Sequence, residues 1–286
     1  MKYIKYFFQF LLATIFFVLF KILGATLSSK ISGKIFELIG PFFRSEEIIN
    51  SNIKRAIPDV ELKEIKKIKK SMWNNYGRIF AEYMFIKNFR FGNLSSKIDI
   101  EGKNILDEII KSKKQVVFIS GHLGNFELMA MSIEKAGINL STIYRPLNNI
   151  FLNKIMETIR EKYICKYQIK KGIGGLKNLI KLKNKNFSTA LMIDQRVSEG
   201  ILSNFFGQKA STTTIPGQLI KKFNIPVVPV YIERTKDINF KIIINKPIYF
   251  SDNDTIESIT DELNKILEVM IIKNPKQWIW SHNRWK

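Results

Sequence analysis

The chain has 286 residues, 45% of them apolar, and a formal net charge of +21. This length and apolar content are enough for a full hydrophobic core and exclude a disordered chain. One cysteine and two histidines exclude an internal disulfide framework and argue against a transition-metal enzyme, so no cofactor is expected. The basic charge favours anionic partners, among which nucleic acid, lipid headgroups and acidic proteins stay open at this point.

The first element is a hydrophobic helix. Residues 6–20 are apolar except for Gln9 and Thr14, which is too hydrophobic on every side for a helix that covers one face of a core. About 20 residues span a bilayer, and residues 3–23 are just long enough. Lysines at both ends of this segment can reach the headgroups.

We therefore predict two units, an uncleaved N-terminal membrane anchor over residues 1–29 and one soluble domain over residues 30–286. A secretory signal is the main alternative for the first unit, with residues 24–26 (GAT) as a weak cleavage site. A buried core helix is the other alternative.

Beyond the anchor, the pattern changes from helical to alternating. Residues 31–95 are expected to be helical, because apolar side chains recur every three or four positions, most clearly over residues 61–85. Strand-like runs and helical runs then alternate, which predicts an α/β domain with a mixed sheet flanked by helices. The expected strands are 116–120, 140–143, 189–193, 226–232 and 240–244, and the expected helices are 103–112, 125–136, 150–162, 175–183, 214–223 and 256–272.

The segment 122–127 (HLGNFE) carries the strongest chemical signal. Gly121 breaks the apolar run 115–120, which places His122 at the end of a strand. Asn125 is a plausible N-cap for the following helix, so that Glu127 falls in its first turn, near His122. A carboxylate there can hold one ring nitrogen of the imidazole and leave the other free to take a proton.

A structural role for His122 is the alternative, since a single histidine in a short motif more often satisfies hydrogen bonds than it catalyses a reaction. The second histidine, His282, lies in a tryptophan-rich basic tail with no nearby carboxylate, and we do not place it in the site.

Two further polar segments follow predicted strands. Arg145 follows the strand 140–143, and a guanidinium there can bind a phosphate or a developing oxyanion. Asp194, Gln195 and Arg196 follow the strand 189–193 directly. Because sites in α/β sheets are built at strand ends, these segments and His122 are expected to converge on one crevice.

Six blocks, in order along nearly the whole chain, resemble the late acyltransferases of lipid A synthesis, the lauroyl and myristoyl transferase family. The blocks are residues 121–127 (GHLGNFE), 144–149 (YRPLNN), 194–196 (DQR), 205–207 with 210–214 (FFG and ASTTT), 227–230 (VVPV) and 277–285 (QWIWSHNRW). One departure lies in the tail, where the family commonly has His-Arg-Arg and this chain has Asn283 after His282.

The resemblance implies an enzyme at the cytoplasmic face of the inner membrane. It implies transfer of a fatty acyl group from acyl carrier protein to the hydroxyl of a 3-hydroxyacyl chain on a Kdo-bearing lipid A precursor. It also implies the fold of the glycerol-phosphate acyltransferases. Acyl carrier protein, the precursor and anionic inner-membrane lipids would then be the partners of the basic surface, with no role for nucleic acid.

By this resemblance, His122 is the general base and Glu127 orients and balances its charge. The residues expected to bind substrate are Asn125, Arg145, Asp194, Gln195 and Arg196. A glycerophospholipid acyltransferase is the nearest alternative and a thioesterase a more distant one. A membrane-tethered nucleic-acid-binding protein is the alternative outside enzymes, although no recognition motif supports it.

Overall fold

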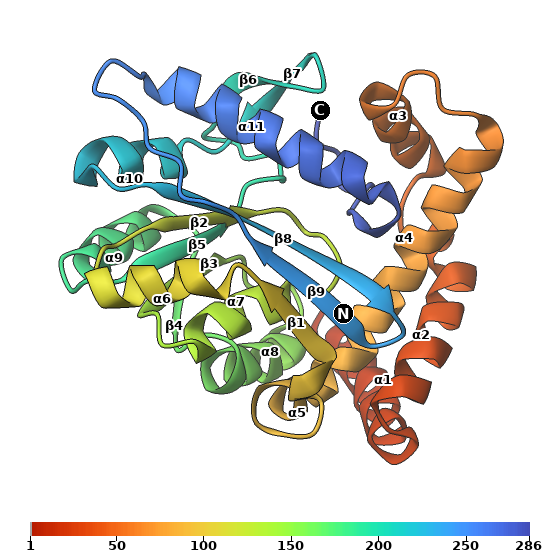
Figure 1. The fold of residues 1–286 in the computed structure, drawn as a ribbon. Helices are drawn as coiled ribbons and strands as arrows, with labels where there is room; N and C mark the ends of the chain where they lie inside the picture. The colour runs from red at the N-terminus through yellow and green to blue at the C-terminus, as the bar shows by residue number, and fades with distance from the viewer. Residues whose placement is uncertain (1) are drawn as a thin grey trace.

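The computed structural model describes residues 2–286, with the backbone alone at Ile173, Leu176 and Lys183. A single twisted sheet forms the centre, with helices on both of its faces (Figure 1). The expected α/β domain with a mixed sheet and one N-terminal apolar helix is confirmed.

The first third of the chain is helical, as its three- and four-residue periodicity predicts. Helices α1, α2 and α4 gather at one end of the sheet, on the right of the view in Figure 1. The elements are α1 (Lys2–Leu23), α2 (Ala25–Ile39), η1 (Gly40–Phe43), α3 (Glu46–Ala56), α4 (Leu62–Glu82), η2 (Tyr83–Phe85), α5 (Ile86–Phe91) and η3 (Ser95–Lys97).

Helix α1 is long and apolar enough to cross a membrane, by its length and composition. Most of its apolar side chains are exposed, among them Leu12 and Ile15, whereas Phe20 near its end is buried. The ring of Phe17 lies 5.0 Å from that of Phe80 on α4, measured between centroids. The end of α1 therefore packs on the domain, and the boundary expected at residue 29 falls inside α2.

The main sheet has seven strands, in the order β1-β9-β8-β2-β5-β3-β4. Neighbours are parallel except for the antiparallel pair β8 and β9. The strands are β1 (Ile98–Glu101), β2 (Val117–Ser120), β3 (Leu140–Tyr144), β4 (Tyr167–Lys170), β5 (Ser188–Met192), β8 (Val227–Lys236) and β9 (Asn239–Ile244). A separate antiparallel hairpin is formed by β6 (Ile201–Phe205) and β7 (Gln208–Thr212).

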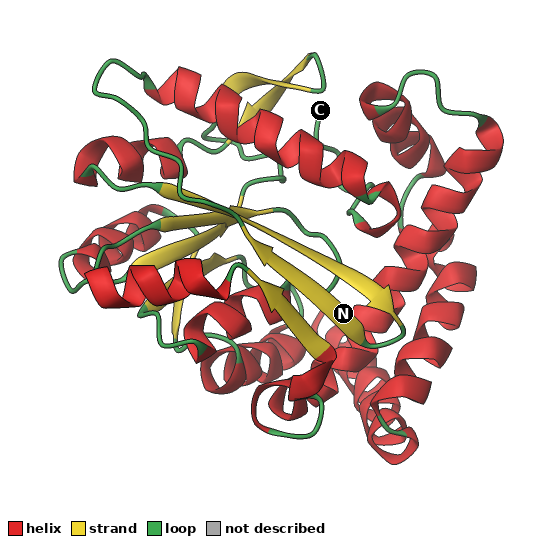
Figure 2. Ribbon diagram, in the orientation of Figure 1, coloured by secondary structure: helices red, strands yellow, loops and turns green. Residues whose placement is uncertain are grey.

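Helices cover both faces of the sheet. In Figure 2 the long helix α11 lies above the yellow strands, and α7 and α8 lie below them. The remaining elements are α6 (Lys103–Ser112), α7 (Glu127–Lys135), α8 (Ile150–Tyr163), α9 (Ile173–Lys183), α10 (Ile215–Phe223), α11 (Ile256–Lys273) and η4 (Pro275–Gln277). The central strand β2 is buried along its whole length, as its run of apolar residues predicts.

Candidate active site

The site lies where three neighbouring parallel strands end. Strands β2, β5 and β3 are adjacent and run in the same direction, so the loops that follow them leave the same edge of the sheet. Ser120 at the end of β2 pairs with Met192 at the end of β5. His122 and Asp194 each lie two residues further along, which brings their side chains together.

Asp194 holds both the ring and the backbone of His122. The ring Nδ1 lies 2.7 Å from Oδ1 of Asp194, and the backbone N–H of His122 donates to Oδ2 at 2.8 Å. Oδ2 also accepts a 2.8 Å hydrogen bond from Nε1 of Trp278. Two of these contacts hold His122, and the contact with Trp278 holds the carboxylate in place.

The carboxylate is fully buried, and its contacts favour the ionised form. Burial alone raises the pKa of Asp194, but the neighbouring charge of His122 and the hydrogen bonds from His122 and Trp278 lower it to about 2. An ionised carboxylate only accepts hydrogen bonds, so Nδ1 of His122 carries a proton. In a neutral imidazole Nε2 is then the basic nitrogen.

Glu127 lies in the first turn of α7, as expected, but its carboxylate contacts Arg160 on α8. Nε of Arg160 donates to Oε1 of Glu127 at 3.0 Å, and Nη2 donates to the same oxygen. Burial lowers the pKa of Arg160, but the charges and hydrogen bonds of Glu127 and Tyr83 together raise it overall. The contacts of the described residues include no hydrogen bond between Glu127 and His122.

The physical reason for this difference is the sheet order. The neighbour of β2 is β5, so the carboxylate that reaches Nδ1 comes from a strand end 72 residues further along the chain. Glu127, in contrast, starts a helix beside α8, where a buried guanidinium is the stronger partner.

Asn125 is not the N-cap that the sequence suggests. Helix α7 begins at Glu127, with Phe126 in the cap position and no side-chain cap bond. The side chain of Asn125 is buried and donates to Oε2 of Glu82 at 2.9 Å. This prediction was wrong because Glu82, on a distant helix, offers Asn125 a charged acceptor.

A cavity of about 340 Å³ opens beside His122. Its wall combines polar groups from the strand ends with apolar side chains, and it includes the predicted residues Glu127, Arg145, Gln195 and Arg196. Asn125 and Asp194 are not part of its lining, and Asp194 reaches the cavity through His122. The apolar part of the lining includes Met129, Ala130, Ile143, Ala190, Leu191 and Met192.

Two arginines at this cavity have no partner for their side chains among the described residues. Arg145 follows β3 and Arg196 follows β5, and both are exposed. Lys171, after β4, is a third exposed cation in the lining. Unpaired cations beside a cavity suit an anionic group of a ligand better than they suit a structural ion pair.

His282 also lines the cavity, although sequence reasoning left it out. Its Nε2 accepts a 2.9 Å hydrogen bond from the backbone N–H of Arg196. Burial lowers the pKa of His282, which favours the neutral ring that such an acceptor requires. Nδ2 of Asn52 on α3 holds the backbone carbonyls of Trp280 and His282, at 2.8 Å each.

The C-terminal tail is thus a wall of the site, through Trp278 and His282. The sequence does mark this tail, by the close spacing of Trp278, Trp280, His282 and Trp285. Their spacing does not show which strand end the tail covers. Arg160 was missed for the same reason, since its partner is known only from the packing of α7 against α8.

Comparison with known proteins agrees with the resemblance carried by the six blocks. A family model described as bacterial lipid A biosynthesis acyltransferase matches residues 1–286. The chain is 23% identical over 189 residues to lipid A biosynthesis acyltransferase 2 of Shigella flexneri, covering 63% of this chain and 58% of that protein. It is 21% identical over 247 residues to the lipid A biosynthesis lauroyltransferase of Escherichia coli (strain K12), covering 85% and 79%.

A third relative, the lipid A biosynthesis myristoyltransferase of Escherichia coli (strain K12), is 21% identical over 198 residues, covering 65% of this chain and 58% of that protein. The matched region thus spans 58% of the length of two of these three relatives. The family match itself extends over the whole chain. The chain therefore belongs to the bacterial lipid A biosynthesis acyltransferase family, a family of enzymes.

Proposed function

We propose that this protein transfers a fatty acyl group from acyl carrier protein to the hydroxyl of a 3-hydroxyacyl chain on a Kdo-bearing lipid A precursor. The observation that carries the proposal is the contact between Nδ1 of His122 and the buried, ionised Asp194, beside a cavity with an apolar wall. Family membership supports the lipid A precursor as the acceptor.

In the proposed reaction, Nε2 of His122 takes the proton of the acceptor hydroxyl while the oxygen attacks the carbonyl carbon of the acyl thioester. The tetrahedral intermediate then collapses, the carbon–sulfur bond breaks, and the imidazolium returns the proton to the leaving thiol. The products are the ester and the free thiol of the carrier, with no acyl-enzyme intermediate. Asp194 holds Nδ1–H in place and stabilises the imidazolium while it exists.

This proposal gives Asp194 the orienting role that the sequence suggested for Glu127. In this proposal Glu127 has an indirect role. Its ion pair with Arg160 holds the guanidinium in a fixed position at the cavity wall. Arg145 and Arg196 contact the anionic groups of donor or acceptor, and Gln195 contributes a polar part of the wall.

The apolar side of the cavity is proposed to hold the acyl chain during transfer. Met129 and Ala130 on α7 and Leu191 and Met192 on β5 are part of this lining. Apolar area removed from water contributes about 25 cal/mol per Å², so each methylene of the chain adds to donor affinity.

We propose that helix α1 anchors the protein in the inner membrane, with the catalytic domain on the cytoplasmic face. Its exposed apolar surface and the lysines at its ends support this placement. The net charge of +21 supports contact with anionic lipids and with acidic carrier protein. We also propose that the α/β domain shares the fold of the glycerol-phosphate acyltransferases.

The test is an acyl transfer assay with purified, detergent-solubilised full-length protein. The donor is acyl carrier protein that carries a radiolabelled fatty acyl group. A Kdo-bearing lipid A precursor and a lysophospholipid are offered in parallel as acceptors. We expect label in the lipid A product, with a mass increase of one acyl group. Label in the phospholipid alone would overturn the acceptor assignment, and free fatty acid alone would indicate a thioesterase.

A further inference from the structure

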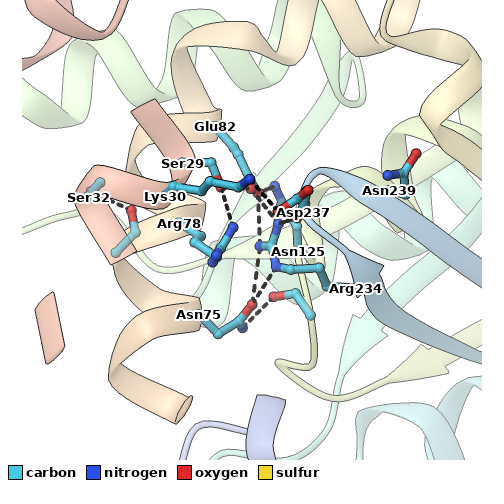
Figure 3. Close-up of polar contacts among 12 residues, drawn as sticks. Ser29, Lys30, Ser32, Asn75, Arg78, Glu82, Asn125, Arg234, Asp237 and Asn239 are labelled. Carbon is cyan, nitrogen blue, oxygen red and sulfur yellow. Dashed lines mark hydrogen bonds and ion pairs between the residues drawn. The ribbon is translucent and has the colours of Figure 1, made fainter. Parts of the chain in front are cut away.

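A buried polar network contacts the loop that follows His122, at Gly124 and Asn125 (Figure 3). Its centre is an ion pair between Glu82, at the end of α4, and Arg234 on β8. Nη1 and Nη2 of Arg234 donate to the two carboxylate oxygens of Glu82, the second at 3.0 Å. The side chain of Glu82 is fully buried and that of Arg234 is 8% exposed.

Two amide side chains connect this ion pair to the loop of residues 121–126. Nδ2 of Asn125 donates to Oε2 of Glu82 at 2.9 Å. Asn75 on α4 accepts from Arg234 through Oδ1, at 3.2 and 3.3 Å, and donates through Nδ2 to the carbonyl oxygen of Gly124 at 2.9 Å. Figure 3 shows Asn75, Glu82, Asn125 and Arg234 gathered in one cluster.

The loop also lies directly against strand β8. Gly124 has a φ of +51°, and a Cβ there would lie 3.2 Å from the carbonyl oxygen of Ile232 and from Cα of Glu233. A side chain at this position would therefore contact the β8 backbone tightly, and its positive φ is one that glycine favours. The carbonyl of Gly124 accepts a hydrogen bond from Asn75, and the side chain of Asn125, the next residue, donates one to Glu82.

Stability alone does not account for these polar groups. A buried ion pair is often no more stabilising than apolar residues of the same volume, because both charges lose their hydration. Oδ1 of Asn125 is buried without a hydrogen-bond partner, which is a further cost. What the network does achieve is to fix the loop at its middle, between His122 and Glu127.

We infer that Asn75 and Glu82, held by Arg234, are positioning residues for the proposed acyl transfer. His122 is tied to Asp194 at one end of the loop and Glu127 to Arg160 at the other. The network fixes Gly124 and Asn125, two of the four residues in between, so that Nε2 of His122 keeps its direction toward the cavity. This inference rests on the proposed function, because it assigns these residues to that same reaction.

The first test replaces Asn75 by Asp. This variant keeps the shape of the side chain and the oxygen that accepts from Arg234, but it replaces the donor to the carbonyls of Gly124 and Gln277 by a negatively charged oxygen. We expect kcat for acyl transfer to fall about 10- to 100-fold, with KM for the acyl donor within about twofold, because a small misplacement of a catalytic group costs rate rather than affinity. The matched control is Ser32→Ala, which removes a buried 2.6 Å hydrogen bond to the carbonyl of Gly77 at the α2–α4 contact.

The second test exchanges donor and acceptor across the network. In Asn125→Asp, two carboxylates face each other and kcat should fall at least tenfold. In the double variant Glu82→Gln with Asn125→Asp, the glutamine amide can donate to the new carboxylate but no longer accepts from Nη2 of Arg234, so kcat should recover in part. If Asn75→Asp fails to fold, this pair of variants decides the inference.

A third readout does not depend on the reaction. The chain has two histidines, so labelling with ¹⁵N-histidine gives one ring signal set for His122 and a reference from His282. We expect Asn75→Asp to shift the Nε2 resonance of His122 and leave that of His282 in place.

The outcomes separate the two proposals. If wild-type protein transfers no acyl group, the proposed function is overturned. The His122 resonance then still tests whether the network positions the His122 ring. Active wild-type protein with Asn75→Asp kinetics equal to those of Ser32→Ala overturns the positioning inference. An unshifted His122 resonance, or no recovery in the double variant, overturns it as well.

Discussion

His122 and Asp194 lie at matching positions, two residues beyond the ends of the adjacent parallel strands β2 and β5, with Nδ1 and Oδ1 2.7 Å apart. The pair forms because the sheet places β5 next to β2, although 72 residues separate the two side chains. The proposed base and its proposed orienting carboxylate therefore come from two strand ends rather than from one short motif.

Replacing Asp194 by Asn tests the orienting role. The amide keeps the size of the side chain but removes the negative charge that holds Nδ1–H, so the ring can turn or change tautomer. We expect kcat to fall about 10²- to 10⁴-fold with little change in KM for the acyl donor. The measurement is steady-state acyl transfer, with thermal unfolding to show that the variant is folded. A loss in KM alone would contradict the orienting role.

Replacing Glu127 by Gln tests whether this carboxylate acts on Arg160 or on His122. The Arg160 side chain is 15% exposed and that of Glu127 8%, so loss of the charge should destabilise the protein by about 3 kcal/mol in chemical denaturation. The double variant Glu127→Gln with Arg160→Gln should recover part of that loss, because no unpaired charge remains. The pH dependence of kcat/KM should keep its midpoint, since the carboxylate beside His122 is Asp194. A shifted midpoint would place Glu127 on His122 instead.

His282 predicts a pH dependence of stability. Burial lowers the pKa of its ring below the ordinary value, so the folded state prefers the neutral form. A lowered pKa contributes stability above the unfolded-state value of about 6.5, and this contribution is lost as the pH falls through the lower folded-state value. The charged groups that act on the ring are Asp194, His122, Arg284 and Arg44.

We therefore expect the free energy of unfolding to decrease from pH 7 to pH 5 in the wild type and to decrease less in His282→Gln. Glutamine can accept the Arg196 N–H at every pH in that range. The measurement is urea unfolding at several pH values. Equal slopes in both proteins would show that His282 does not titrate with folding.

Filling the cavity should change the length of the transferred chain. Ala130 on α7 lines the apolar part, and leucine there occupies space that the acyl chain would use. We expect Ala130→Leu to shift the preferred donor toward shorter acyl chains, measured by mass spectrometry of the products from mixed donors. Ala136→Leu, at the exposed end of the same helix, is the control and should leave the preference unchanged. An unchanged chain-length preference in Ala130→Leu would show that the acyl chain does not bind against Ala130.

The sequence was most informative where the pattern is local. Helix α4 and the buried strand β2 follow from apolar periodicity, and Arg145 and Asp194 were placed at strand ends because apolar runs stop just before them. The strands that were missed have weak patterns. Strand β1 alternates between half-buried and exposed residues, and β4 has one buried residue. The hairpin strands β6 and β7 were also missed, and each has two buried residues.

What the sequence did not predict depends on contacts between distant segments. The partner of His122 follows from sheet order, and a pattern of residues within one segment carries no information about that order. The contact of Asn125 with Glu82 and that of His282 with Arg196 bridge 43 and 86 positions. Such pairs are set by tertiary packing, so local capping rules gave Asn125 the wrong partner.

The most direct test of the central claim is acyl transfer by His122→Ala, compared with wild type at equal amounts of folded, detergent-solubilised protein. The account predicts a fall in kcat of at least 10²-fold, because the group that deprotonates the acceptor hydroxyl is gone. Thermal unfolding and labelled-donor binding should stay close to wild type. Turnover near the wild-type rate in this variant would contradict the assignment of His122 as the base.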